Sequence, residues 1–387
     1  MKKNFKYVTM MAVALSMGFT GCSNDSDEQQ PDVVNANSHS VTIKVATKAA
    51  QTRADEATAI GQTPNLSDLT LYFVDDVLNK ITDIQVATPA TITGAGETFN
   101  NLAAGTNAIY IVGNQSEVAS ADLTALSVGD TETDLKEAML NILGQSAATA
   151  PTYENVNVYG YTSYAVGVGQ TQVSVTMDII PAISRLEIGK VEADKVNPPV
   201  ADQITDFDLE GIFINNTYQA IGLDNVTYGT AVAYPSTDAI WGAPVTYPAQ
   251  YCDQFTTLTG LDSYTPTNTW AYYVAPAAKQ VGGSYVGEII SGVQYDAKPI
   301  IVLKLSNVTY NAGYGGTQYD PAYVTVTKLK NGATYLDHFE RGKVYDISSI
   351  AFDATNLTGT PLVPPVHDVE VTVTVKPWDG ISTTPEL

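Results

Sequence analysis

The chain has 387 residues, with 19 basic and 41 acidic side chains, a formal net charge of −22 and an isoelectric point near 4.3. Its length suits two domains of ordinary size. A surface this acidic repels nucleic acid and anionic lipid headgroups, so neither is expected as a partner.

The first 22 residues have the pattern of an export signal. Three lysines among the first six residues precede an apolar run over 8–19, which is too short to cross a bilayer as a helix. Thr20-Gly21-Cys22 then resembles the lipobox of bacterial lipoprotein precursors, although Phe19 stands where leucine is more usual. The resemblance implies a signal peptide over 1–21 and a palmitate-bearing lipid on Cys22. An ordinary signal peptide that ends in a cysteine is the alternative.

Residues 23–30 are acidic and polar, without large apolar side chains. Such a stretch buries too little surface to fold, which predicts a solvated tether. It resembles the acidic tract that follows the lipidated cysteine in surface-exported lipoproteins of the Bacteroidetes. A plain linker is the alternative.

The rest of the chain reads as β-structure. Short runs that alternate apolar and polar residues, rich in Tyr, Thr and Val, are divided by Gly, Pro, Asn and Asp. The runs cover 41–45, 69–74, 108–112, 173–177, 184–188, 300–305, 323–327, 344–347 and 369–375. Many strands with one solvated face favour antiparallel sheets. We therefore predict an all-β chain of two antiparallel β-sandwich domains with one or two short helices.

One segment has helical spacing of its apolar residues, at Leu135, Met139, Ile142 and Leu143. Thr131 or Thr133 can cap its start and Gly144 its end, which predicts a helix up to residue 143. A second candidate, over 121–126, is very short for a helix.

The boundary between the two domains is predicted near residue 183. The run from Val173 to Ile180 reads as the last strand of one domain, Pro181 interrupts it, and a new alternating strand starts at Ser184. This places an N-terminal sandwich over 54–183 and a C-terminal sandwich over 184–360.

A search for catalytic or metal-binding motifs finds none. His39, His338 and His367 stand far apart, and no zinc-protease, phosphate-loop or nucleophile-elbow motif occurs. Cys252 has no partner if Cys22 is acylated, so it is expected to pack as a small apolar side chain. We predict no enzyme, no cofactor and no metal. The 23 tyrosines suit either a sugar-binding face or cross-strand packing.

The two ends of the chain are more informative. The strand at 41–46 is followed by a segment over 47–53 without apolar periodicity, which ends at Arg53-Ala54. Arg185 and Arg341 lie in or beside predicted strands, so Arg53 is the arginine that a protease could reach in a loop. From the residues alone, an ordinary surface arginine is the preferred interpretation of Arg53.

At the other end, Val369, Val371, Val373 and Val375 share one face of a predicted strand. Prolines at 361, 364 and 365 precede this strand and separate it from the body of the chain. Trp378 follows and can anchor its end. The pattern suits a strand that closes its own domain or one that is offered to a neighbouring molecule.

The whole precursor resembles the fimbrillins of the Bacteroidetes, which are subunits of the type V pilus. The resemblance is carried, in this order, by the Cys22 lipobox, the linker ending at Arg53, and the segments 181–188, 338–347 and 369–378. It implies two transthyretin-like, Greek-key β-sandwiches and export as a lipoprotein to the outer membrane and cell surface. It also implies a cut between Arg53 and Ala54 by a trypsin-like, Arg-specific protease.

In that family the cut removes a propeptide, here 22–53, together with its first strand, here Val41, Ile43 and Val45. The C-terminal strand of another subunit then fills the groove, which assigns 361–387 as the donor segment. The expected function is a fimbrial subunit of the pilus stalk that supports cell adhesion. Its expected partners are copies of itself, other fimbrial subunits, the protease and a host or bacterial receptor. A tip or accessory adhesin and a glycan-binding surface lipoprotein are the alternatives.

Overall fold

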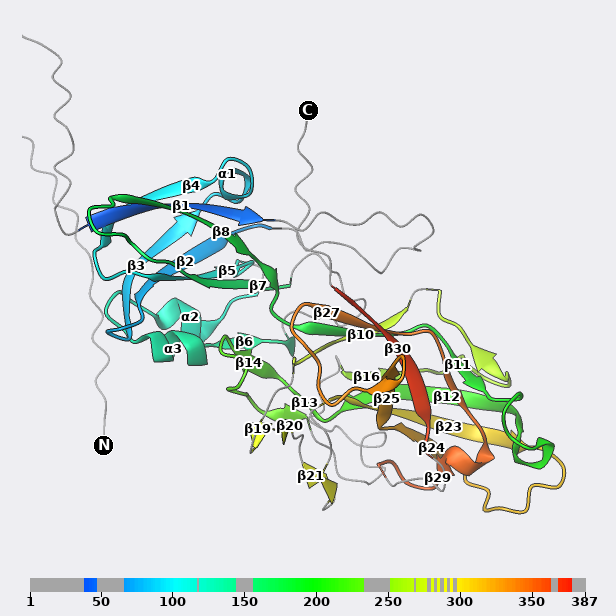
Figure 1. Cartoon of the computed structure of the whole chain (residues 1–387). Helices are drawn as coiled ribbons and strands as arrows, with labels where there is room; N and C mark the ends of the chain where they lie inside the picture. The colour runs from blue at the N-terminus through cyan, green and yellow to red at the C-terminus, as the bar shows by residue number, and fades with distance from the viewer. Residues whose placement is uncertain are drawn as a thin grey trace, which may run out of the picture.

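Two β-rich units lie end to end in an elongated molecule (Figure 1). The computed structural model describes residues 38–46, 66–116, 118–143, 156–232, 251–267, 269–276, 280–281, 284–285, 289–290, 293–294, 298–362 and 368–377. Strands dominate and the helices are short, so the predicted all-β sandwich class is confirmed.

The first unit packs a five-stranded sheet against a three-stranded sheet. The five strands, in spatial order, are β3 (Lys80–Ala87), β2 (Leu69–Asp75), β5 (Ala108–Gly113), β7 (Val158–Ser163) and β9 (Ile180–Pro181). The three strands are β4 (Glu97–Ala103), β1 (Ser38–Ala46) and β8 (Gln172–Asp178). Alternating apolar residues of both sheets, such as Leu71, Phe73 and Phe99, meet in the core between them.

Short helices complete the first unit. They are α1 (Pro89–Thr93), α2 (Ala121–Ala125) and α3 (Glu132–Glu137). Leu123 of α2 and Leu135 of α3 pack on the face of the five-stranded sheet that points away from β1, against Tyr72 and Tyr110 (Figure 1). The helices therefore bury the apolar side chains on this face of the sheet.

The helix predicted up to residue 143 is therefore wrong in length. Thr131 caps α3 as expected, in a capping box with Asp134, but the helix ends at Glu137. Met139–Asn141 forms β6, which pairs with β14 (Ala220–Gly222) of the second unit. The spacing of apolar residues suits a helix locally, but pairing with a distant strand satisfies the same backbone groups and buries Leu140.

The second unit is a larger sandwich. Its six-stranded sheet contains, in order, β18 (Trp270–Val274), β10 (Ser184–Ile188), β27 (Lys343–Ile347), β30 (Glu370–Pro377), β25 (Lys328–Asn331) and β26 (Thr334–Tyr335). The facing sheet contains β16 (Cys252–Gln254), β12 (Ile204–Asn215), β23 (Ile300–Tyr310), β24 (Ala322–Val326) and β29 (Leu357–Thr358). Residues such as Leu186, Ile347, Ile212 and Leu303 fill the core between the sheets.

Smaller elements surround this sandwich. A three-stranded sheet joins β17 (Ser263–Tyr264), β11 (Val191–Ala193) and β28 (Ile350–Phe352). Short pairs are β13 (Thr217–Tyr218) with β15 (Ala231–Val232), β19 (Gln280–Val281) with β20 (Ser284–Tyr285), and β21 (Ile289–Ile290) with β22 (Val293–Gln294). Two 3₁₀ turns cover Val200–Asp202 and Ala354–Asn356.

The sheets are mixed, not purely antiparallel as expected. β1 with β8, β10 with β27, β11 with β28, and β25 with β30 are parallel pairs. Each pair joins segments far apart in the chain, so long connections let both strands run in the same direction. Alternation within a strand reports its half-buried state and not the direction of its neighbour, which is why the sequence missed these pairs.

The units are joined by backbone pairing and by one arginine. Besides the β6–β14 ladder, the Arg341 guanidinium donates hydrogen bonds of 3.1 Å to the carbonyls of Ala182, Gly222 and Leu223. It also lies 4.6 Å from the centre of the Tyr159 ring, on β7 of the first unit. Burial of this guanidinium lowers the pKa of Arg341 to about 10, so it stays charged at neutral pH.

Candidate functional site

β1 contains the residues that the sequence leads us to expect cleavage to remove, so its position in the fold bears directly on function. β1 pairs antiparallel with β4 and parallel with β8, so both edges of its backbone are used. Val41 lies opposite Phe99 on one side and Val173 on the other. Removing β1 would leave two facing rows of unpaired backbone groups, which is a template for another strand.

The side chains of β1 alternate between core and solvent. Val41, Ile43 and Val45 have no exposed surface and contact the core of the first unit. On the outer face, the Thr42 hydroxyl lies 2.9 Å from the Thr98 hydroxyl. A replacement strand must therefore place apolar residues at every second position.

His39 at the start of β1 is a site residue that the sequence search missed. Its Nε2 lies 3.0 Å from the Tyr164 hydroxyl oxygen, although 125 positions separate the two residues. Its Nδ1 is buried and has no hydrogen-bond partner among the described residues. Burial lowers the pKa of His39 and raises that of Tyr164, so the imidazole is held neutral.

Gly96 lets the chain approach β1 closely. Its φ is +94°, a value that L-residues rarely adopt. A Cβ at this position would lie 3.2 Å from the Ile43 carbonyl oxygen. The turn between α1 and β4 therefore closes against the backbone of β1.

Several predicted site residues fall outside the described residues. These are Cys22, Arg53, Ala54 and Trp378. The other two arginines are within the fold. Arg185 lies in the inner strand β10 with its side chain 2% exposed and its Nε 2.5 Å from Glu187 Oε1, and Arg341 joins the units.

The predicted donor strand lies inside its own unit. β30 pairs antiparallel with β27 and parallel with β25, in the middle of the six-stranded sheet. Val369, Val371 and Val373 are buried in the core, and Val375 packs against it. Of the two alternatives that the sequence left open, the described chain shows the strand that closes its own domain.

The positions of β1 and β30 are equivalent in their geometry. Each strand has one antiparallel and one parallel neighbour, and each turns apolar side chains at alternate positions into a core. On the outer face of β30, Glu370 contacts Lys330 and Tyr335, and Lys376 Nζ lies 3.3 Å from Asp346 Oδ2. A strand built for one position thus matches the backbone pattern of the other.

Two segments that carry the family resemblance meet at the joint between the units. Gly342 N donates to the Ile183 carbonyl at 3.0 Å, and Ser184 Oγ donates to the Glu340 carbonyl at 2.7 Å. β10 and β27 continue this contact as a parallel pair. Segments 181–188 and 338–347 therefore contact each other at the joint between the two units.

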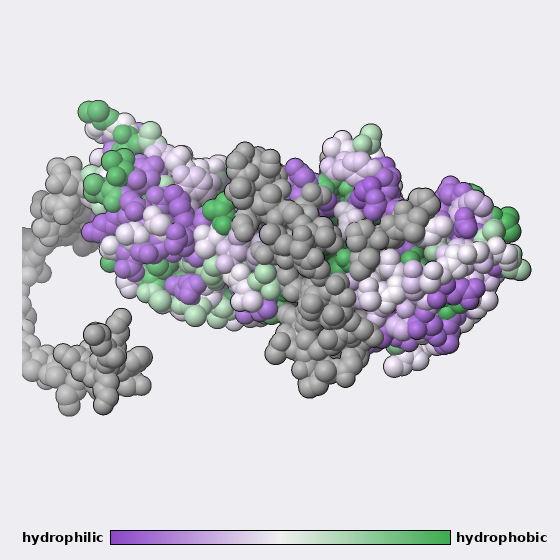
Figure 2. All heavy atoms as spheres, turned by 90° about the horizontal axis from the view of Figure 1, so that it is seen from below, coloured by the Kyte–Doolittle hydropathy of each residue, from purple (hydrophilic) through white to green (hydrophobic). Residues whose placement is uncertain are grey.

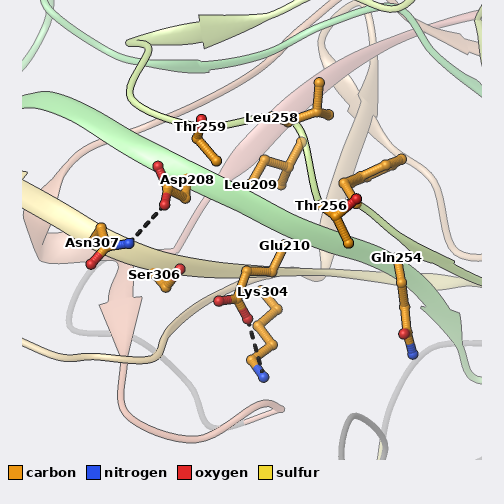
Figure 3. Close-up of a pocket in the computed structure, with 11 residues that line it drawn as sticks. Asp208, Leu209, Glu210, Gln254, Thr256, Leu258, Thr259, Lys304, Ser306 and Asn307 are labelled. Atoms are coloured by element: carbon orange, nitrogen blue, oxygen red, sulfur yellow. Dashed lines mark hydrogen bonds and ion pairs between the residues drawn. The ribbon is translucent and has the colours of Figure 1, made fainter.

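A polar groove of about 390 Å³ lies on the second unit, over β12 and β23 (Figure 3). The Asp208 carboxylate accepts hydrogen bonds of 2.7 Å from Asn307 Nδ2 and Gly260 N. Glu210 pairs with Lys304 at 3.2 Å. The charged groups are thus already satisfied by the protein.

Other chemistry is equally sparse in the described part of the chain. No group of three or more His, Cys, Asp or Glu residues there could hold a metal ion, and no helix there is long and apolar enough to cross a membrane. The exposed aromatic residues found there, Tyr161 and Tyr335, sit on different units. Cys252 is half-buried, and burial raises its thiol pKa to about 11.

Solved structures share this fold. A proposed cell adhesion protein from Bacteroides eggerthii matches with a TM-score of 0.55 and 17% identity, over 88% of this chain and 96% of that one. A similarly described protein from Parabacteroides distasonis matches with a TM-score of 0.54 and 12% identity, over 90% and 99%. A fimbrilin from Porphyromonas gingivalis matches with a TM-score of 0.50 and 12% identity, over 91% and 100%.

Comparison of the sequence with protein-family models and with curated proteins finds no match. At these identities the likeness to solved structures shows the fold alone. The chain has the two-unit β-sandwich fold of these adhesion and fimbrial proteins, over nearly the whole length of each.

Proposed function

We propose that this chain is a structural subunit, in the stalk, of a surface fimbria. It is exported to the outer membrane as a lipoprotein through Cys22, cut after Arg53 by a trypsin-like protease, and polymerised by donor-strand exchange, and the fibre supports adhesion. The observation that carries this proposal is β1, a central strand whose inward side chains are fully buried and which precedes an arginine-containing linker. The fold shared with a fimbrilin supports it.

The energetics favour replacement of β1 by another strand of the same pattern. Burial of Val369 and of the three valines of β30 is worth roughly 6–12 kcal/mol at about 1.5–3 kcal/mol each, as an upper bound. β30 must first leave a position in its own sheet that buries the same side chains. The gain and the loss are therefore similar in size, and exchange is favoured where cleavage has emptied the β1 position.

The proposal is tested with synthetic peptides of residues 38–46 and 368–377. The full-length chain is folded, cleaved at Arg53 and freed of its N-terminal fragment, and peptide binding is followed by fluorescence polarisation. We expect both peptides to bind. The substitutions Ile43→Asp and Val373→Asp should abolish binding of their peptides, because each places an unpaired charge in an apolar core.

Outward-facing substitutions are the matched controls. Thr42→Asp and Thr372→Asp peptides should bind nearly as well as the originals, and an Arg53→Ala chain, which keeps β1, should take up neither peptide. If the cleaved chain stays folded by circular dichroism yet binds no peptide, or binds inward and outward variants equally, the exchange mechanism is wrong.

One observation favours a tip or accessory subunit as the second candidate. β30 is already paired on both edges within its own unit, as suits a subunit that accepts a strand and does not donate one. Immunogold labelling of sheared fibres separates the two positions. Label along the whole fibre indicates a stalk subunit, and label at one end indicates a tip.

A further inference from the structure

Exposed apolar side chains gather at the end of the first unit that lies farthest from the second. β2 begins at Leu69 and β7 at Val158, beside the joint, so the β2–β3 turn and the loop after β7 lie at the opposite end. Loop 127–130 joins the turn, because Gly129 N donates to the Ile81 carbonyl at 2.9 Å. The exposed residues here are Val77, Leu78, Val128 and Val168.

The far end of the second unit has a similar group. The chain leaves the joint at Ser184, runs outward along β10 and β11, and turns back into β12 through residues 194–203. The neighbouring loop is tied to this turn by Lys195 Nζ, which lies 2.5 Å from Asp262 Oδ2. The exposed residues here are Val196, Val200 and Leu261.

These two groups account for seven of the eleven exposed large apolar side chains in the described part of the chain. Single exposed apolar residues are ordinary on protein surfaces. Their concentration at both extremities of an elongated molecule is not, and Figure 2 shows green, apolar surface among the polar surface at each extremity.

The two strands proposed to exchange, β1 and β30, begin at these same two ends. β1 begins beside the loop that carries Val168, where Ser40 N donates to the Thr171 carbonyl at 2.8 Å. β30 begins at the far end of the second unit, where Asp368 and Glu370 line one pocket with Asp194 and Pro198. A strand that left the β30 position would therefore pivot beside Val196 and Val200.

We propose that the far end of the second unit of one copy packs against the far end of the first unit of the next copy. This contact rests on the proposed function and adds an apolar surface to strand exchange. A second copy is the occupant, because the two strands proposed to exchange between copies begin at these same two ends. Two different surfaces meet, so the contact does not close on itself and extends into a fibre.

Cross-linking of assembled fibres tests which surfaces meet. Leu78→Cys and Val196→Cys are made in separate chains, each with Cys252→Ala, and a short bismaleimide is added to fibres. We expect cross-linked pairs only in fibres that contain both variants. Cross-links in fibres of one variant alone, or none in mixed fibres, would overturn the proposal, and mixed Val86→Cys and Val226→Cys fibres are the control.

Aspartate substitutions test whether the contact contributes to growth. The pair Val196→Asp and Val200→Asp should slow fibre growth at least tenfold, while Val86→Asp with Val226→Asp, two exposed valines away from the ends, should leave growth unchanged. The melting temperature of each monomer should not move. If the unaltered chain forms no denaturant-resistant ladder, the proposed function fails and this contact with it. If the ladder forms and both pairs behave alike, the end contact alone is wrong.

Discussion

Burial lowers the pKa of His39, so we expect the binding of β1 to depend on pH. The imidazole is almost fully buried and held neutral, and its ordinary pKa is 6.5. Protonation would place a charge in this packed site, which disfavours the folded state. Its one described polar contact is the Tyr164 hydroxyl, which accepts or donates according to the tautomer.

We expect acid to destabilise the first unit. Between the folded pKa of His39 and 6.5 the unfolded chain binds more protons, so the free energy of unfolding falls as pH drops through this interval and levels below it. Each unit of pKa depression is worth about 1.4 kcal/mol. Urea denaturation of the uncleaved chain at pH 7.5 and 5.0 measures the loss.

The His39→Leu variant should lose this part of the pH dependence, because it has no group to titrate at that position. Tyr164→Phe is the control, since it removes the hydroxyl but keeps the imidazole, and should retain the dependence at a cost of about 1 kcal/mol. An unchanged pH profile in His39→Leu would show that other groups cause it.

β1 and β30 show how one strand pattern serves two positions. Both alternate apolar and polar residues, and both are paired on two edges. The sequence of β30 predicts which side chains point into a core, but it does not predict whether that core is in the same chain or in a neighbouring subunit. The structure places Val371 and Val373 in the core of the same chain.

Substitutions in β30 of the whole chain should therefore act on folding first. Val371→Asp and Val373→Asp should each lower the free energy of unfolding by more than about 3 kcal/mol, because each buries an unpaired charge. Thr372→Asp, on the exposed face, should change it by less than about 0.5 kcal/mol. Chemical denaturation of the monomer measures both.

Assembly of a chain truncated after Pro377 then separates the roles of the strand and the tail. If this chain folds and forms the denaturant-resistant ladder, β30 contains the assembly information. If it folds but forms no ladder, the tail beyond β30 is required, and β30 belongs to its own domain.

The two units are joined by the β6–β14 ladder and by the contacts of Arg341. Arg341 holds carbonyls on the linking segment and on the second unit while its guanidinium contacts Tyr159 of the first. A lysine at this position has one nitrogen in place of the three that donate here, so it cannot reproduce this arrangement of hydrogen bonds.

Arg341→Lys should lower the free energy of unfolding by about 2–5 kcal/mol, because it leaves buried carbonyls without donors. It should also split thermal unfolding into two transitions, as the units lose their coupling. Lys343→Met, which removes a neighbouring cation whose nearest described acid is Glu340 at 4.0 Å, is the control and should leave a single transition. A single transition in Arg341→Lys, measured by calorimetry, would place the coupling in the remaining contacts of the joint, such as the β6–β14 ladder.

The sequence by itself determined the β-class, the described alternating strands and the inward faces of β1 and β30. Those features follow from a local pattern of period two, which any half-buried strand must have. The sequence also contains no recognisable catalytic motif, and this can be read from it directly because such motifs are defined by local residue spacing.

Only the tertiary structure decided which strands are neighbours. It paired β1 with β8 in parallel, ended α3 early so that β6 could cross to β14, brought His39 to Tyr164, and set β30 between β27 and β25. Each of these contacts joins residues distant in the chain, and each is settled by which arrangement satisfies the most backbone groups and buries the most apolar surface at once. The alternating pattern of a strand shows that it needs a neighbouring strand and a core to pack on. Which strand becomes that neighbour depends on the rest of the fold.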